Sequence, residues 1–395
     1  MRTSAPLKRR WGFPNPTPSD LSSAPGTLSS GETELNRIQI ACLIALLAAL
    51  AVIAAACSDR DDQVTAATST VTPGDGLVSI GAGLSGIEGL EATVYTTGIA
   101  HASAFAFDDD GRLWVGTAAY TDDGSDGIYL VPGAGETPVE VVAGLHTVLG
   151  LLWYDGSLYV SAKEAVYAYS GFDGEAFSDQ RTVVQFPAGV GEVNGIVLSP
   201  DGRMLAGISS PCDHCTPANE YSAAIVSFLP DGSDIQVYAS GIRAPIALAY
   251  FPGTSDLFVT MNQRDDLGDA TPGDWLSTVS EGDDWGFPDC YGQDGPACAG
   301  IPSPVAALDR HAALSGLAIV TGQLGAAVGN AAIVAEWQTG RVQMVSLEQT
   351  GNGYSSEVSP FLAGTANPVA VTLAPDGALL VSDWTSGTVY RIARV

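Results

Sequence analysis

The hydrophobic positions after residue 90 follow one pattern that recurs along the chain. Each repeat has a polar residue, an alternating apolar segment, a turn and a second apolar segment. In four repeats the turn contains an Asp-Gly pair, which is typical of tight hairpins, and these pairs are Asp110-Gly111, Asp155-Gly156, Asp201-Gly202 and Asp376-Gly377. The pattern therefore predicts paired antiparallel strands.

The spacing of the repeats indicates how these strands are organised. The repeats begin near residues 101, 146, 192, 243, 311 and 367, and steps of 45 and 46 residues separate the first three. Such a step is the size of one four-stranded propeller blade, and no helical period appears after residue 90. We therefore expect an all-β fold, a six-bladed β-propeller of four-stranded antiparallel blades, over residues 91–395.

The N-terminal part of the chain has a different character. Residues 1–36 are rich in Ser, Pro, Thr and Gly and show no apolar period, which predicts disorder. Residues 38–56 are nearly all apolar and precede Cys57. This is typical of a lipoprotein signal that leaves Cys57 lipidated, or of an uncleaved membrane anchor. Both interpretations predict an exported domain, tethered to the membrane at the cell-envelope or extracellular face through a flexible linker over residues 58–90.

The net charge of the chain argues against one class of partner, the nucleic acids. The sequence has 16 Lys and Arg residues against 44 Asp and Glu residues, a formal net charge of −28. An acidic surface repels phosphates, so we expect no nucleic acid partner. Clusters of Asp can still supply the oxygen ligands that Ca²⁺ requires.

The cysteines that follow Cys57 form two local pairs. We expect two disulfides, Cys212–Cys215 and Cys290–Cys298, because local pairs suit an oxidising compartment. Cys212 and Cys215 could also be half of a zinc site together with His214, but no second pair of ligands has suitable spacing.

Alignment of the repeats on their turns brings one polar residue of each repeat to the same place. This place is the loop that leads into the innermost strand, and in a propeller such loops surround the central axis on one face. Three of the four histidines are in this set, which is His101, His146, Glu192, Arg243, His311 and Asn367. Because His can act as a general base at neutral pH, the catalytic candidates are His101, His146 and His311.

The stretch 262–292 interrupts the repeats. It is rich in Gly, Pro and Asp, which predicts a loop without strand or helix, yet it carries Trp275, Trp285 and Phe287. We expect these aromatic side chains to hold the loop in an ordered position over the same face. Its segments RDDLGD, DWLSTV and GDDWGFPDCYG resemble the pyrroloquinoline-quinone (PQQ) dependent sugar dehydrogenases of the glucose/sorbosone type. The resemblance covers about residues 95–395.

This resemblance implies a reaction and a set of residues. The family has a six-bladed propeller that carries PQQ and Ca²⁺ on its top face and oxidises a sugar or alcohol by hydride transfer to PQQ while a His takes the proton. Arg243, in SGIRAP, corresponds to the family's cofactor-binding arginine. The remaining candidates for the cofactor are Arg264, Asn194 and Asn367, and those for the metal are Asp265, Asp266 and Asp269.

The sequence departs from the family pattern at four places. Gly191 or its neighbour stands where the family has its catalytic His, Asn194 replaces the Arg of that motif, and Ala244 replaces the Asn that follows the loop arginine. Lys163 is the single lysine after Cys57, so the family's cofactor-binding lysine near the last blades has no counterpart.

Three functions remain open, and in each we expect a monomer. The first is a PQQ-dependent dehydrogenase whose partner is a small sugar or alcohol. The second is a non-enzymatic propeller that binds a carbohydrate or a protein ligand at the cell surface. The third is a lactonase-like hydrolase with one metal in the channel, for which Glu192 is the one axial acid of the repeats.

Overall fold

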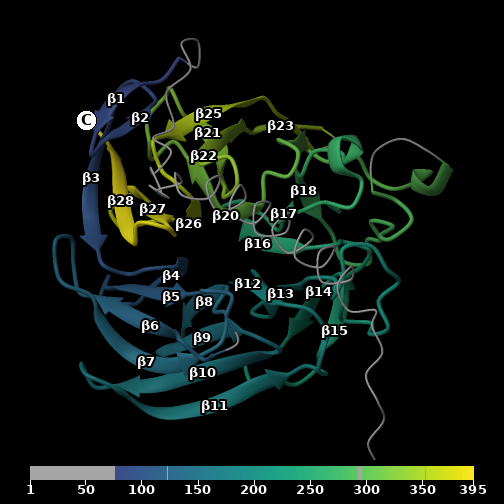
Figure 1. Cartoon of the computed structure of the whole chain (residues 1–395), viewed down its shortest axis with the longest axis horizontal. Helices are drawn as coiled ribbons and strands as arrows, with labels where there is room; N and C mark the ends of the chain where they lie inside the picture. The colour runs from purple at the N-terminus through teal and green to yellow at the C-terminus, as the bar shows by residue number, and fades with distance from the viewer. Residues whose placement is uncertain (1–75, 122, 292–295, 352) are drawn as a thin grey trace, which may run out of the picture. The chain divides into compact units, whose positions relative to one another are not determined.

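The computed structural model describes residues 76–121, 123–291, 296–351 and 353–395, which form six antiparallel sheets around a central axis (Figure 1). The predictions for the N-terminal segment, including lipidation of Cys57 and most of the linker, lie outside the described residues. Within the described ranges, no helix has both the length and the apolar character needed to cross a membrane.

The six sheets confirm the predicted propeller. Blades 1 to 4 follow the chain without interruption, with four strands each. Their strands are β4(Ala102–Phe107), β5(Leu113–Thr117), β6(Asp126–Val131), β7(Val139–Leu145); β8(Gly150–Tyr154), β9(Ser157–Ala162), β10(Ala165–Phe172), β11(Phe177–Gln185); β12(Val193–Leu198), β13(Met204–Ile208), β14(Ala224–Phe228), β15(Gln236–Ala239); and β16(Pro245–Tyr250), β17(Leu257–Met261), β18(Trp275–Val279), β19(Ala306–Ala307).

The last two blades take strands from both ends of the described chain. Blade 6 consists of β26(Pro368–Leu373), β27(Leu379–Asp383), β28(Thr388–Arg394) and β3(Leu90–Thr97). Strand β3 pairs antiparallel with β28, with Thr97 opposite Thr388 and Leu90 opposite Arg394. The ring is therefore closed by hydrogen bonds between β3 and the C-terminal strand β28.

Blade 5 is wider than expected. Its four strands are β20(Leu314–Thr321), β21(Asn330–Glu336), β22(Arg341–Ser346) and β25(Val358–Ala363), with a separate hairpin of β23(Glu348–Thr350) and β24(Gly353–Ser355). Two further strands, β2(Leu84–Gly86) and β1(Val78–Gly81), extend its outer edge. The expected linker over residues 58–90 is thus corrected in its last part, where the chain is already in a sheet.

The second strands of the blades are deeply buried. All five residues of β5, β13, β17 and β27 are buried, because each of these strands packs against neighbouring blades on both faces. The largest fully buried side chains include Trp114, Phe228, Phe258 and Phe361. Burial of such a side chain stabilises the fold by about 1.5–3 kcal/mol.

Glycine allows the innermost strands to approach one another. A Cβ at Gly150 in β8 would lie 2.7 Å from the carbonyl oxygen of Asn194 in β12, and a Cβ at Gly195 would lie 2.8 Å from that of Ile246 in β16. These distances are too short for a side chain. The repeats therefore place small residues where neighbouring blades meet at the axis.

The stretch 262–292 contains a strand, so the expectation of a loop throughout is wrong. Trp275–Val279 forms β18, which pairs along its whole length with β17 of blade 4. The short run of strand-forming residues between the polar segments is nearly all buried, and this tertiary packing overrides the polar composition around it. Trp285 then returns to stack on Trp275, with ring centroids 4.5 Å apart.

Both predicted disulfides are present. Cys212 is bonded to Cys215 and Cys290 to Cys298, with Cα atoms 6.0 and 4.9 Å apart. The alternative of a zinc site at Cys212 and Cys215 is therefore wrong. Two short 3-10 turns, η1(Gly268–Ala270) and η2(Pro296–Cys298), are the helical elements of the described residues.

Candidate functional site

The face on which the innermost strands begin, called the top face below, carries two connected cavities. The polar cavity, of about 550 Å³, is lined by Lys163, Glu164, Glu192, Asp213 and Arg243 among others. The aromatic cavity, of about 410 Å³, is lined by Trp337, Trp384 and apolar residues. Both have Tyr120, Ile246 and Asn262 in their walls, so the two cavities adjoin one another.

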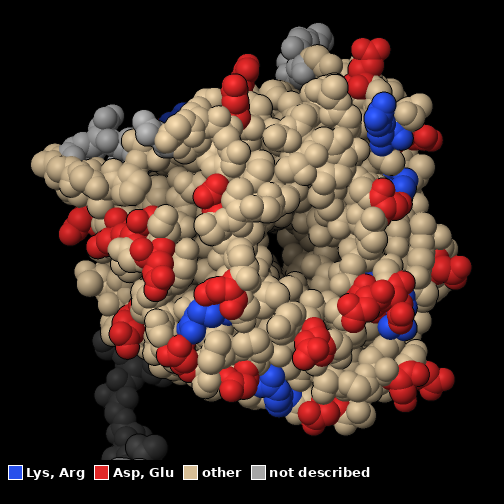
Figure 2. All heavy atoms as spheres, turned by 180° about the vertical axis from the view of Figure 1, so that it is seen from behind, with Lys and Arg blue, Asp and Glu red and all other residues tan. Residues whose placement is uncertain are grey.

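Charge is distributed unevenly over the molecule. Figure 2 shows Asp and Glu spread over the outer part of the opposite view, with few Lys and Arg, while mainly uncharged residues border the central opening. The border of this opening therefore carries few charged side chains in this view.

Two tryptophans form the wall of the aromatic cavity. Trp337 and Trp384 meet edge to face with centroids 6.0 Å apart. The indole nitrogen of Trp384 donates to the carbonyl oxygen of Ala118 at 2.8 Å, which fixes the ring. His101 lies against Trp384, with ring centroids 4.3 Å apart, and lines neither cavity.

These tryptophans occupy a second repeated position that the sequence reasoning missed. In every blade the residue directly after the second strand donates its backbone N–H to a carbonyl of the loop that leads into the first strand; these residues are Ala118, Lys163, Ser209, Asn262, Trp337 and Trp384. All but Ala118 line one of the two cavities. The signal was present in the sequence, because the same repeat alignment brings these positions together.

The carbonyl groups that accept these hydrogen bonds also correct the alignment of the polar residues at the start of each repeat. They are residues 101, 146, 192 and 367 as expected, but Ala244 and Ala313 in blades 4 and 5. Arg243 and His311 therefore precede the aligned position by one and two residues. His311 lies outside both cavities, while Arg243 still lines the polar one.

Arg243 is held by three hydrogen bonds. Its Nη2 lies 2.6 Å from Oδ1 of Asp213, its Nε donates to the Asp213 carbonyl at 3.0 Å, and its Nη1 donates to the Asn262 carbonyl at 3.1 Å. Asp213 in turn accepts the backbone N–H groups of Asp265 and Asp266, each at 2.8 Å. The disulfide loop of residues 212–215 is thereby joined to both the cavity and the long top-face loop.

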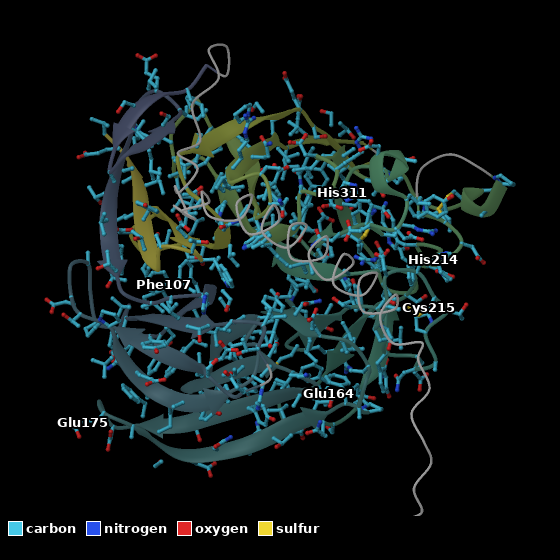
Figure 3. The ribbon with its side chains drawn as sticks, in the orientation of Figure 1. Phe107, Glu164, Glu175, His214, Cys215 and His311 are labelled. Atoms are coloured by element: carbon cyan, nitrogen blue, oxygen red, sulfur yellow. A yellow bond between two sulfur atoms is a disulfide. The ribbon has the colours of Figure 1, made fainter. Side chains whose placement is uncertain are left out.

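His311 also holds the long top-face loop in place. Its Nδ1 lies 2.7 Å from Oδ1 of Asp265 and its Nε2 lies 2.9 Å from the carbonyl oxygen of Gly268. Both partners are acceptors, so the imidazole satisfies both when each nitrogen carries a proton, and these bonds raise the pKa of His311. Figure 3 places His311, His214 and Cys215 on the same side of the ring. In this arrangement both ring nitrogens of His311 have partners within the protein.

Of the three Asp residues predicted to bind metal, Asp265 and Asp266 have other partners for their carboxylates. Asp266 forms a two-pronged ion pair with Arg264, with both N–O distances 2.6 Å, and Asp265 contacts His311. The carbonyl of Asp269 accepts a hydrogen bond from Arg310. In the part of the chain that the structure describes, no three His, Cys, Asp or Glu side chains are grouped to hold a metal ion. The arrangement does not support the calcium prediction.

The remaining candidates are dispersed. His146 lines a neighbouring pocket of about 370 Å³ together with Lys163 and Glu164. Asn194 is buried at the central channel and donates to Ser209 Oγ and to the Pro245 carbonyl, each at 2.9 Å. Asn367 donates to the Trp337 carbonyl at 2.9 Å and thereby positions that residue.

Glu192, like Arg243, is a predicted residue that lines the polar cavity. Burial raises the pKa of its carboxyl, and the positive charges of Lys163 and Arg243 partly oppose this. Tyr120 is 59% exposed and lines both cavities, so its hydroxyl is open to a ligand.

These groups do not fit PQQ with Ca²⁺. A tricarboxylate needs nearby cations, yet the polar cavity sets Lys163 and Arg243 against the carboxylates of Glu164, Glu192 and Asp213. The guanidinium of Arg243 is already bound to Asp213. None of the four histidines, all of which are described, lines either cavity.

Comparisons with known proteins agree with the fold. The family described as SMP-30/Gluconolactonase/LRE-like region matches residues 102–263. No curated protein matches the chain. Among solved structures, the PQQ-bound aldose sugar dehydrogenase from Streptomyces coelicolor is similar with a TM-score of 0.63 and 19% identity, covering 77% of this chain and 98% of that one.

Two further structures are similar to the same extent. The holo form of the pyranose dehydrogenase PQQ domain from Coprinopsis cinerea has a TM-score of 0.64 and 17% identity, and covers 79% of this chain and 97% of its own. The soluble aldose sugar dehydrogenase from Escherichia coli, in its apo form, has a TM-score of 0.61 and 17% identity, with 78% and 100% covered. The chain therefore has the six-bladed β-propeller fold that these sugar dehydrogenases share.

Proposed function

We propose that this protein binds a sugar or a related polyol in the connected cavities of its top face. The observation that carries the proposal is the position of Trp337 and Trp384 beside the polar cavity. The C–H faces of a sugar ring stack on indole rings, while its hydroxyl groups need hydrogen-bonding partners. The polar cavity offers such partners in Glu192 and Tyr120.

Export is part of the same proposal. The two disulfides support an oxidising compartment. The apolar segment before Cys57 would then attach the propeller to the membrane, by a lipid on Cys57 or as an uncleaved anchor.

Calorimetric titration of the purified protein with a panel of aldoses, polyols and sugar lactones tests the proposal. We expect saturable binding of at least one class without added quinone. Trp384→Ala should weaken this binding, whereas Trp153→Ala, on blade 2 outside both cavities, should not. Heat signals that never saturate with any of these compounds would reject the proposal.

Oxidation of a sugar with PQQ is the second candidate. It is favoured by Arg243, which lines the polar cavity at the position that the resemblance assigns to the cofactor-binding arginine. The other groups do not fit the quinone, so we expect no saturable PQQ binding in the presence of Ca²⁺. Binding that is saturable and lost in Arg243→Ala would favour the dehydrogenase.

A further inference from the structure

Glu192 is fixed in the polar cavity by its main chain. Its carbonyl oxygen accepts the N–H of Ser209 at 3.0 Å. The preceding residue is Gly191, at a φ of 111°, where a Cβ would collide with the Ser209 carbonyl. The backbone thus has little freedom to move the side chain elsewhere.

The carboxylate of Glu192 differs from the other two in this cavity. Glu164 accepts the N–H of Gly189 at 2.6 Å, and Asp213 binds Arg243. Glu192 accepts no hydrogen bond from any residue that the structure describes. Its acceptor oxygens are available to a molecule in the cavity. A partly desolvated carboxylate without a hydrogen-bond partner is stabilised when a ligand donates a hydrogen bond to it.

Tyr120 links this carboxylate to the aromatic cavity. Tyr120 is in the wall of both cavities, and it lines the polar cavity together with Glu192. A ring stacked on Trp337 and Trp384 can therefore extend a substituent toward Glu192. The nearby carboxylates outnumber the cations, which disfavours an anionic substituent there.

We propose that Glu192 binds the ligand directly and that the cavity selects amino sugars and neutral sugars over sugar acids. The inference rests on the proposed function, because it names the ligand class for the same site. A protonated amine would form an ion pair with Glu192, an uncharged hydroxyl would donate a single hydrogen bond to its carboxylate, and a ligand carboxylate would be repelled.

Calorimetric titrations with glucosamine, glucose and gluconate test this selectivity on the wild-type chain, on Glu192→Gln and on Glu175→Gln. Glu192→Gln keeps the shape of the side chain and removes its charge. Glu175 lies far from the cavities, at the outer edge of blade 2 (Figure 3), so its variant is the control for loss of one negative charge.

We expect glucosamine to bind more tightly than glucose, gluconate to bind most weakly, and a span of about tenfold or more between the first and the last. Glu192→Gln should remove most of this span while its thermal midpoint stays that of a folded protein, and Glu175→Gln should keep it. Gluconate binding as tightly as glucosamine, or an unchanged span in Glu192→Gln, would overturn the role of Glu192 but not the sugar-binding function. Binding of none of the three sugars would overturn both this inference and the sugar-binding function.

Discussion

Asp213 binds Arg243 with a distance of 2.6 Å between Oδ1 and Nη2, and the same carboxylate accepts the N–H groups of Asp265 and Asp266. One side chain therefore holds both a cavity residue and the long top-face loop. The disulfide between Cys212 and Cys215 encloses Asp213 in a four-residue loop and limits where it can lie.

Asp213→Ala should release the top-face loop. The part-buried Arg243 would lose its charged partner, at a cost of about 1–3 kcal/mol, and two exposed backbone N–H groups would lose their acceptor. Hydrogen exchange followed by mass spectrometry should show faster exchange in peptides covering Asp265 and Asp266. Exchange at the wild-type rate would mean that Asp213 does not hold the loop.

The Cys212–Cys215 disulfide should affect the same peptides. In the double variant Cys212→Ser and Cys215→Ser, Asp213 gains freedom, so exchange around residues 265–266 should accelerate. The global stability should change only modestly, because the closed loop is short. Cys290→Ser with Cys298→Ser is the matched control and should leave those peptides unchanged; equal effects of the two double variants would contradict this.

Asp265→Asn should lower the pKa of His311. The hydrogen bond from Nδ1 to Asp265 raises this pKa in the wild type, with the Gly268 carbonyl as the second cause. The stabilisation from His311 is therefore full below the ordinary His pKa of about 6.5 and is lost as the pH rises through the raised value. The chain has four histidines, so the imidazole NMR signals can be assigned and titrated. An identical pKa of His311 in the wild type and in Asp265→Asn would show that this hydrogen bond does not raise it.

Asp274 should make the stability fall with rising pH. Burial raises its pKa to about 6, although the N–H groups of Gln263 and Ala313 donate to it at 2.7 and 3.1 Å. The unfolded chain loses this proton near pH 4 and the folded chain near pH 6, so the contribution is full below pH 4 and lost through pH 6. The difference corresponds to on the order of 3 kcal/mol.

Urea unfolding of the wild type and of Asp274→Asn at several pH values isolates this contribution. The free energy of unfolding of the wild type, minus that of the variant, should decrease between pH 4 and pH 7. An increase over that range would show that the two N–H donors outweigh burial and keep Asp274 ionised.

The repeats made the fold predictable from the sequence. A blade needs two strands with a buried face joined by a tight turn, and this local pattern is visible without knowledge of tertiary contacts. Strand β18 was missed because its five residues lie between polar segments and become a strand through pairing with β17. Strands β1 and β2 were missed for a similar reason, since they are short and extend the edge of a distant sheet.

The site was only partly predictable. The alignment of the first strands correctly brought Glu192 and Arg243 to one cavity. It could not reveal that Asp265 and His311 form a hydrogen bond with each other, because that contact depends on how the loop folds. Trp337 and Trp384 follow the second strands, so an alignment of first strands alone did not compare them.

The central claim is that a sugar binds against Trp337 and Trp384 without a quinone. Saturation-transfer difference NMR with the purified wild-type chain, the best-binding sugar and no PQQ tests this most directly. We expect transfer to the sugar ring protons in the wild type and in Trp153→Ala, and its loss in Trp337→Ala and Trp384→Ala. Transfer that persists in both cavity variants, or that appears only after PQQ and Ca²⁺ are added, would contradict the claim.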